Sequence, residues 1–321
     1  MTFPVSLDNA LAARDRIAPH LVPTPLRNYR ELDNAVGNGI HILVKHENHQ
    51  PTNSFKIRNA LSAMSALSAS ERGLGVVGAT RGNHGLGLAK AGALLGIPVT
   101  VVVPFGNNAE KNSGMRSLGA RLIEYGNDYD SAVVEADRLC REEGLTLIHS
   151  TNNHDVLSGA ATITLEVLDQ AGELDSMVFA VGGGSQAVGA ISLLSVLRPD
   201  VRVYGVQAEG APACFESWKA RRRIPRFPPN TIADGIATGD TYEMTFPTLR
   251  DGLEGFVLVS DDDIMNATRA LIQYTHNLVE PAGAAGLAGV FKLRDELSSQ
   301  TVCVMISGGN IDAPTLKKIL S

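Results

Sequence analysis

Short apolar runs and longer segments with a single apolar face alternate along most of the chain. The run Val99–Val103 is apolar at almost every position and is stopped by Pro104, a pattern typical of a strand buried on both faces. The segment before it, 83–95, has helical spacing and ends at Gly96. The same patterns predict further strands at 40–44, 74–79, 121–125, 177–181, 201–207 and 301–306. They predict further helices at 7–17, 54–69, 109–118, 130–143, 156–170, 189–197, 261–277 and 282–297.

Strands and helices that alternate at this spacing predict an α/β protein whose parallel sheets are covered by helices on both faces. The alternation is interrupted near Ser150 and resumes with the helix at 156–170. We therefore expect two parallel-sheet regions that separate near Ser150. Before the first strand, Pro23 and Pro25 predict a stiff extended segment, because each proline disfavours helix in the residue before it.

Composition narrows the class of protein. The 321 residues are 44% hydrophobic and 19% charged, which is typical of a folded globular protein with a sizeable core. The net charge of −6 argues against nucleic acid as a partner, and we interpret the only basic run, 221–223, as a solvated helix end. The three cysteines are scattered and predict neither a disulfide framework nor a zinc site. Because no signal peptide or membrane-spanning run is evident, we expect a soluble cytoplasmic protein without a membrane partner.

One lysine, Lys56, stands at the start of a predicted helix, just after the strand-like run that ends near Glu47. Ser54 is a candidate N-cap for this helix. Taken alone, a lysine in this position is most often a solvated surface residue. Three polar or glycine-rich junctions further along the chain favour a functional role instead, because ligands of open α/β sheets bind at the carboxyl ends of strands.

The first junction follows the strand at 74–79 and contains Thr80, Arg81, Gly82, Asn83 and His84. It opens a helix, so its backbone N–H groups are free to bind an anion. A tight strand-to-helix turn would also explain Gly82, but it would not explain the polar residues beside it.

The second junction, with three consecutive glycines, is the strongest local signal. It lies between a buried strand and a helix and comprises Gly182, Gly183, Gly184, Ser185 and Gln186. Such a run favours a backbone cradle for a phosphate over a plain flexible turn. No Gly-Lys-Ser/Thr follows it, so it is not a nucleotide P-loop, and its spacing does not match the dinucleotide GxGxxG pattern.

Together with a third junction at the end of the last strand, these motifs resemble those of pyridoxal-phosphate enzymes with the tryptophan synthase β-subunit fold (fold type II). Within that fold they are most similar to the serine/threonine dehydratase and serine racemase group. The likeness extends from Thr24-Pro25-Leu26 nearly to the end of the chain. The motifs, in order, are Ser54-Phe55-Lys56, Gly82-Asn83-His84, Gly182-Gly183-Gly184 and Ser307-Gly308-Gly309-Asn310.

The resemblance implies pyridoxal 5'-phosphate as the cofactor and a role for each matching residue. Lys56 would form the Schiff base with the cofactor aldehyde and act as the catalytic base, and Phe55 would pack near the ring. Asn83 would bind the ring's 3-hydroxyl, and Ser307 would face the pyridine nitrogen. The phosphate would lie on 182–186, and the 80–84 segment would bind the substrate.

The activity implied is that of an ammonia-lyase (dehydratase) that eliminates water from a β-hydroxy amino acid such as L-threonine or L-serine. The products are a 2-oxo acid and ammonia. A serine beside the pyridine nitrogen does not stabilise full ring protonation, which suits β-elimination. The alternatives are an amino-acid racemase or a β-replacement enzyme of the same fold, and a non-catalytic ligand-binding relative, against which the intact Lys56 argues.

Two departures from the family pattern bear on the activity and on metal binding. Serine racemases have an acid/base serine where this chain has Arg81, and a guanidinium is a poor base, which disfavours racemisation. The anion that binds Arg81 could be the substrate α-carboxylate, a side-chain carboxylate, the cofactor phosphate or a structural acid. Some relatives bind a divalent cation through a Glu and an Asp six residues apart. Here Glu209 matches the first and Phe215 replaces the second, so we predict no such metal site.

The resemblance also implies a domain organisation. Residues 1–70 and 151–321 would form a large cofactor-binding domain, and 71–150 a small one. The chain stops just after its last helix, so we expect no C-terminal regulatory domain and no feedback by isoleucine. Relatives are commonly dimers, which implies a homodimer here.

Two further clusters are interpreted as structural features, and one further residue is a candidate for the site. The run 46–49 lacks the HExxH spacing of a zinc site and is read as a strand end. The acidic run 261–263 is read as a helix N-terminus that complements the helix dipole. Glu280 opens a helix near the implied cofactor pocket and is a secondary candidate for the site.

Overall fold

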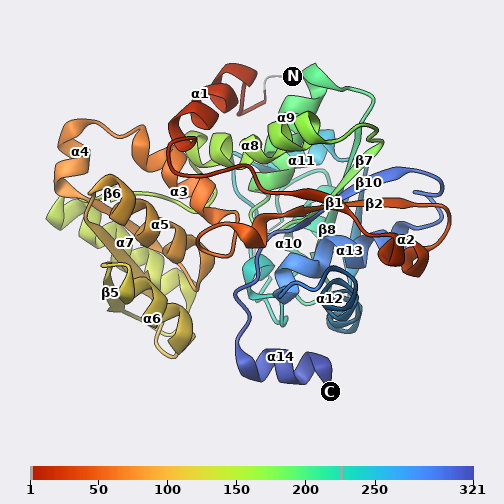
Figure 1. Ribbon diagram of the computed structural model, residues 1–321. Helices are drawn as coiled ribbons and strands as arrows, with labels where there is room; N and C mark the ends of the chain where they lie inside the picture. The colour runs from red at the N-terminus through yellow and green to blue at the C-terminus, as the bar shows by residue number, and fades with distance from the viewer. Residues whose placement is uncertain (1–2, 225–226) are drawn as a thin grey trace.

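The structure is a computed structural model that describes residues 3–224 and 227–321 (Figure 1). Its strands are β1 (Leu26–Asn28), β2 (His41–His46), β3 (Val76–Ala79), β4 (Val99–Val103), β5 (Arg121–Glu124), β6 (Thr146–Leu147), β7 (Ser176–Ala180), β8 (Arg202–Ala208), β9 (Gly255–Val259) and β10 (Thr301–Ile306). Its α-helices are α1 (Leu7–Ile17), α2 (Arg30–Val36), α3 (Lys56–Ser65), α4 (Ala69–Leu74), α5 (Asn83–Leu95), α6 (Ala109–Ser117), α7 (Tyr129–Glu143), α8 (His154–Gln170), α9 (Ser185–Leu197), α10 (Ala213–Lys219), α11 (Phe246–Gly252), α12 (Asp261–Thr275), α13 (Pro281–Leu293) and α14 (Ala313–Leu320). Two short 3₁₀ helices lie at Glu47–His49 and Asp234–Ile236.

Two separate sheets confirm the predicted α/β class. The larger has the strand order β1-β2-β10-β7-β8-β9, in which only the β1–β2 pair is antiparallel. The smaller has the order β5-β4-β3-β6 and is parallel throughout. Figure 1 shows the smaller sheet and its helices on the left and the larger sheet on the right. Because parallel strands end at the same edge, each sheet gathers its strand-to-helix junctions on one side.

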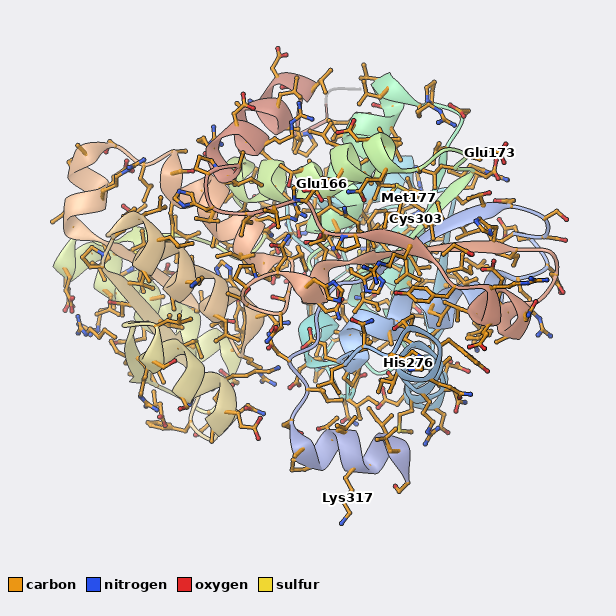
Figure 2. The ribbon with its side chains drawn as sticks, viewed as in Figure 1. Glu166, Glu173, Met177, His276, Cys303 and Lys317 are labelled. Carbon is orange, nitrogen blue, oxygen red and sulfur yellow. The ribbon has the colours of Figure 1, made fainter. Side chains whose placement is uncertain are left out.

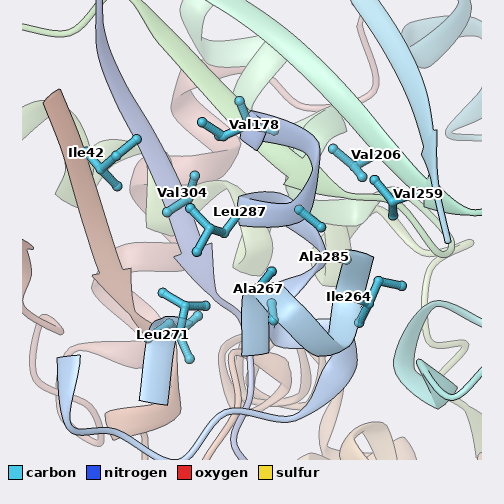
Figure 3. Packing of buried hydrophobic residues seen from close by; sticks show 14 of the residues in the cluster. Ile42, Val178, Val206, Val259, Ile264, Ala267, Leu271, Ala285, Leu287 and Val304 are labelled. Carbon is cyan, nitrogen blue, oxygen red and sulfur yellow. The ribbon is translucent and has the colours of Figure 1, made fainter. Parts of the chain in front are cut away.

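Apolar residues pack on both faces of the larger sheet. On one face, α12 and α13 cover β2, β10, β7, β8 and β9, and Figure 3 shows this packing around Val304, Val178 and Leu287. On the other face, α8 and α9 bury residues such as Met177 and Cys303. Helix α13 lies so close to the sheet that a Cβ on Gly289 would be 2.1 Å from a Val206 methyl carbon. Small residues on α13 therefore set its distance from the strands.

Several element boundaries differ from those predicted. The helix predicted over 54–69 is shorter, because α3 ends at Ser65. A separate helix, α4, begins at Ala69 with a capping box at Ser68. Ser54 does not cap α3, because Ser54 forms an isolated β-bridge with Gly308 instead. Helix α9 begins at Ser185 rather than residue 189, so its N-terminus lies directly behind the three glycines.

Other predictions are confirmed or remain open. The helix at 83–95 and the strands at 99–103 and 301–306 have the predicted bounds, and Ser260 caps α12 ahead of its three aspartates. The elements β1, β6, β9, α2, α10, α11 and α14 were not predicted from the sequence. Strands β1 and β6, with three and two residues, are too short for a clear period. The proline-rich loop at 225–229 lies partly outside the described residues.

The domain boundaries at residues 70 and 150 stay a prediction. Helix α3 packs with the smaller sheet, in a core that includes Ile57, Leu61 and Val101. The chain before residue 70 therefore contributes to the core beside each sheet. Within residues 3–224 and 227–321, no helix is long and apolar enough to cross a membrane. The three cysteines are free, as predicted.

Candidate active site

A cleft of about 860 Å³ contains every residue proposed for the site from the sequence. Its walls come from the start of α3, the β3–α5 and β7–α9 junctions and the end of β10. The predicted residues that line it are Phe55, Lys56, Thr80, Arg81, Gly82, Asn83, His84, Gly182, Gly183, Gly184, Ser185, Gln186 and Ser307. Junctions from both sheets thus meet at one cavity, although they lie up to 252 residues apart in the sequence.

Lys56 is the first residue of α3 and projects into this cleft. The turn before it is tied to the end of β10, because the Phe55 backbone N–H donates to the Ser307 carbonyl at 3.1 Å. Lys56 Nζ donates to the Ser150 carbonyl at 3.3 Å and lies 4.9 Å from the centre of the Phe55 ring. Burial lowers the pKa of Lys56 to about 8. A neutral amine, which is a nucleophile and a base, is therefore accessible near physiological pH.

The three glycines leave a backbone surface that side chains would block. A Cβ on Gly183 would lie 2.2 Å from Thr151 Oγ1, and Gly184 has a left-handed φ of 87°. Gly184 is also the N-cap of α9 and makes no side-chain cap bond, which leaves helix N–H groups free. Nearby, the buried Gln186 Nε2 has no hydrogen-bond partner among the described residues. These free donors at a helix N-terminus fit a phosphate group.

Asn83 begins α5 and is held on both sides of its amide. Asn310 Nδ2 donates to Asn83 Oδ1 at 2.8 Å, and Asn83 Nδ2 donates to Glu280 Oε1 at 2.5 Å. One N–H of the Asn83 amide remains for a group in the cleft. Glu280 is only a secondary candidate from the sequence, and nothing in the sequence indicates its contact with Asn83.

His84 lines the cleft but is buried, and it is not an acid or base near neutral pH. Its Nε2 donates to the Ile148 carbonyl at 2.8 Å, because a carbonyl only accepts. Burial first, and then the Lys56 charge, lower the pKa of His84 to about 3. The neutral ring therefore carries its proton on Nε2, and Nδ1 is an acceptor without a partner among the described residues. This arrangement orients the 80–84 turn.

Ser307 and Arg81 lie at different depths. Ser307 directly follows the buried strand β10 and is 9% exposed, whereas Arg81 is exposed. Arg81 also lines a neighbouring cleft that contains His149 and Tyr242. No ion pair among the described residues includes Arg81, so a salt bridge to a structural acid there is not found. Its guanidinium is available to a ligand at the junction of the two clefts.

Several residues of the cleft were missed from the sequence. They are Lys111, Ser150, Asp234 and Gly235. Lys111 lies inside α6 in an ordinary polar helix pattern, and Asp234-Gly235 has the appearance of a surface turn. No local sequence motif identifies Lys111, Asp234 or Gly235, because they reach the cleft only through the packing of α6 and of the Asp234–Ile236 turn.

Beneath Lys56, a buried network of charged groups supports α3. Arg58 donates to both oxygens of Glu47, at 2.7 and 2.9 Å, and to both oxygens of Glu166, at 2.6 and 2.8 Å. Lys45 Nζ donates to Glu166 at 2.7 Å and to the Thr24 carbonyl at 2.7 Å. Glu166 is buried, and Figure 2 labels it on α8. The network connects β2, α3 and α8 two residues beyond Lys56.

The other residues considered for metal binding have structural contacts. Glu47 is held by Arg58, and His46 Nε2 lies 2.9 Å from the Tyr29 hydroxyl. Phe215 packs edge-on against Phe256. In the described part of the chain, no group of three His, Cys, Asp or Glu could hold a metal ion. The absence of a divalent-cation site at Glu209 stays a prediction.

Comparison with known proteins agrees with this geometry. The family model "Pyridoxal-phosphate dependent enzyme" matches residues 17–308. The chain is 32% identical to an L-threo-3-hydroxyaspartate ammonia-lyase from Pseudomonas sp over 315 residues, covering 98% of each protein. It is 36% identical to an L-threonine ammonia-lyase from Thermotoga maritima over 285 residues, covering 88% of this chain and 70% of that protein. Maize serine racemase superimposes with a TM-score of 0.93 at 30% identity, covering 99% of this chain and 97% of the racemase.

Proposed function

The chain belongs to the family of pyridoxal-phosphate-dependent enzymes, and from this premise we propose that it is an ammonia-lyase acting on a β-hydroxy amino acid. The reaction would remove the β-hydroxyl as water and yield a 2-oxo acid and ammonia. The observation that carries the proposal is Lys56, a lysine with a pKa of about 8 in a cleft that also contains a backbone cradle of glycines. Relatives named as ammonia-lyases over nearly the whole chain support it.

The residues fit the cofactor. The free N–H groups at the start of α9 and the unpaired Gln186 Nε2 would hold the phosphate. Lys56 would hold the cofactor covalently, and Phe55, Asn83 and Ser307 would orient its ring. When bound, pyridoxal phosphate supplies a carbon that accepts an amine and a conjugated ring that delocalises the charge left on the substrate Cα.

The chain's own groups would then carry out the elimination. Backbone N–H groups of the 80–84 turn would bind the amino-acid carboxylate. Lys56 Nζ, once neutral, would take the proton from the substrate Cα. Arg81 stays protonated and cannot return that proton from the other side. A site with a base on one side favours elimination over racemisation.

The experiment that tests the function is an assay of purified holoenzyme with L-threonine, L-serine and 3-hydroxyaspartate stereoisomers. Release of a 2-oxo acid and ammonia in equal amounts is expected from at least one of them. Conversion of an L-amino acid to its D-enantiomer at a higher rate than 2-oxo acid release would instead support the racemase alternative. If the protein turned over none of these amino acids and bound no cofactor, the proposal that it is an enzyme would be contradicted.

The lowered pKa of Lys56 predicts how cofactor loading depends on pH. The neutral amine is the form that reacts with the cofactor aldehyde, so the rate at which apoenzyme regains visible absorption should rise with pH. Because burial lowers the pKa of Lys56 to about 8, the half-maximal rate is expected near pH 8. An ordinary lysine would give a half-maximum near pH ~10.4. Stopped-flow absorbance after addition of pyridoxal phosphate measures this profile.

Replacing Arg81 with alanine tests its role in substrate binding. We expect KM for the amino acid to rise about tenfold or more, the loss typical of a charge-assisted hydrogen bond, while the affinity for the cofactor stays within about twofold. The matched control is Arg116→Ala, which removes an exposed arginine paired with Glu124 on the surface of the same half of the molecule. Kinetics of Arg81→Ala that equal those of the control would exclude Arg81 from the site.

A further inference from the structure

The amide of Asn83 is fixed by a chain of polar contacts that the proposed function does not by itself explain. Its oxygen accepts from Asn310 Nδ2, which also donates to the Thr52 carbonyl at 2.8 Å. Its nitrogen donates to Glu280 Oε1 at 2.5 Å. If the Asn83 amide rotated by 180°, its oxygen would face the Glu280 carboxyl and its nitrogen would face the Asn310 amide nitrogen, so both hydrogen bonds would be lost. Asn83 therefore presents an N–H, and not its oxygen, to the cleft.

Glu280 is placed for this role by backbone atoms of two elements. It is 6% exposed and is the N-cap of α13. Its backbone N–H donates to the Gly308 carbonyl at 3.1 Å, and a Cβ on Gly308 would be 2.2 Å from Glu280 Oε1. Only glycine at 308 leaves room for the carboxylate beside Asn83. Burial raises the pKa of Glu280, whereas the nearby Lys111 charge opposes that rise.

Lys111 completes the arrangement from the other half of the molecule. It lies on α6, and its Nζ is 3.9 Å from Glu280 Oε2. Its side chain is 14% exposed and lies along Gly82, where a Cβ would be 2.8 Å from Lys111 Cδ. The other acid near Glu280 is Asp234, whose charge disfavours a second carboxylate. Lys111 is therefore the cation that pairs with Glu280 across the cleft and favours its charged form.

We propose that Glu280 and Lys111 are a positioning pair, in which Lys111 pairs with the Glu280 side chain across the cleft and Glu280 fixes Asn83 so that its free N–H points at the bound cofactor. This inference rests on the proposed function. Neither residue of the pair touches the reacting atoms; both act through Asn83. Because the pair spans α6 and α13, it also connects the orientation of Asn83 to the spacing between the two sheet regions.

The experiment compares Glu280→Ala, Glu280→Gln, Lys111→Met and the double variant Glu280→Ala/Lys111→Met as holoenzymes. Three quantities are measured: kcat, KM and the pH titration of the cofactor's visible absorption. Glu110→Gln is the matched control, since Glu110 is an exposed acid on the same helix as Lys111. Thermal unfolding by circular dichroism establishes that each variant is folded at the assay temperature.

Glu280→Ala is expected to lower kcat about tenfold with KM within about threefold, and to shift the absorption titration by at least about half a pH unit. Glu280→Gln retains an oxygen for the Asn83 N–H but loses the charge that pairs with Lys111. It is therefore expected to lose less kcat than Glu280→Ala and about as much as Lys111→Met, within about threefold of the natural protein. Lys111→Met should lower kcat in the natural background but not further in Glu280→Ala, because coupled residues give non-additive effects.

The positioning pair would be overturned if Glu280→Ala and Glu280→Gln lowered kcat equally. It would also be overturned if the fold-losses of kcat at Glu280 and Lys111 simply multiplied in the double variant. An absorption titration that no variant shifts would overturn it as well. The proposed function fails separately, if the natural holoenzyme has no lysine-linked chromophore and releases no 2-oxo acid. A natural holoenzyme that is active, with variants that behave as Glu110→Gln does, refutes only the inference about Glu280 and Lys111.

Discussion

Replacing Lys56 with alanine is expected to reduce the rate of 2-oxo acid release by at least about a thousandfold, because one side chain supplies both the covalent link to the cofactor and the base. In the structure, Lys56 is the cleft lysine whose pKa burial lowers to about 8. The variant should also lack the visible absorption of the lysine-linked cofactor. Activity is measured by coupled assay of the 2-oxo acid, and the chromophore by absorption after gel filtration.

Lys317→Ala is the matched control. Lys317 is exposed on α14, and Figure 2 shows it pointing away from the molecule. Its replacement should leave both the rate and the absorption spectrum unchanged. A Lys56→Ala enzyme that keeps a tenth or more of the natural rate would show that another group is the base. Retention of the chromophore in Lys56→Ala would show that another lysine holds the cofactor.

Replacing Arg58 with alanine is expected to destabilise the fold by about 3–5 kcal/mol, because it leaves two buried carboxylates without their main partner. Glu47 is fully buried, and although burial alone would raise its pKa, the Arg58 guanidinium holds that pKa below its usual value. The loss corresponds to a fall in Tm of about 10 °C for a chain of this size. Urea unfolding followed by circular dichroism, with and without cofactor, measures the change.

Arg121→Ala provides the control for charge removal alone. Arg121 makes a two-point ion pair with Glu143, at 2.7 and 3.2 Å, but both side chains are exposed. An exposed pair contributes only about 0–1 kcal/mol, so this variant should unfold nearly as the natural protein does. If Arg58→Ala were as stable as Arg121→Ala, the buried network would not support the start of α3.

An element could be predicted from the sequence when the interactions that specify it lie between residues close together in the chain. Val99–Val103 and Thr301–Ile306 were predicted with their observed bounds, because an apolar run between turn residues specifies a buried strand without further context. Ser54 was misinterpreted as a cap for the opposite reason. It follows a strand and precedes a helix, as caps do, but its backbone pairs with Gly308, 254 residues away. Pairing over that separation leaves no local pattern.

The candidate site shows the same division. Lys56, Asn83, the glycines of 182–184 and Ser307 were found because each is in a short motif at the end of a predicted strand. That they form one site was implied by the family resemblance, and the cleft brings them together. Lys111 and Asp234 were not found, and the contact between Glu280 and Asn83 was not foreseen, because none of these residues belongs to a motif.

The order of residues specifies the alternation of strands and helices, the backbone freedom at the glycine-rich junctions and the position of Lys56 at the start of α3. These depend on residue type and on neighbours within a few positions, which the order of residues states directly. Which charged side chains form ion pairs follows only from the tertiary fold. The strand orders β1-β2-β10-β7-β8-β9 and β5-β4-β3-β6 bring Arg58 to Glu166 and Lys111 to Glu280. Burial then gives Lys56 its lowered pKa, because removal from water disfavours an ammonium ion.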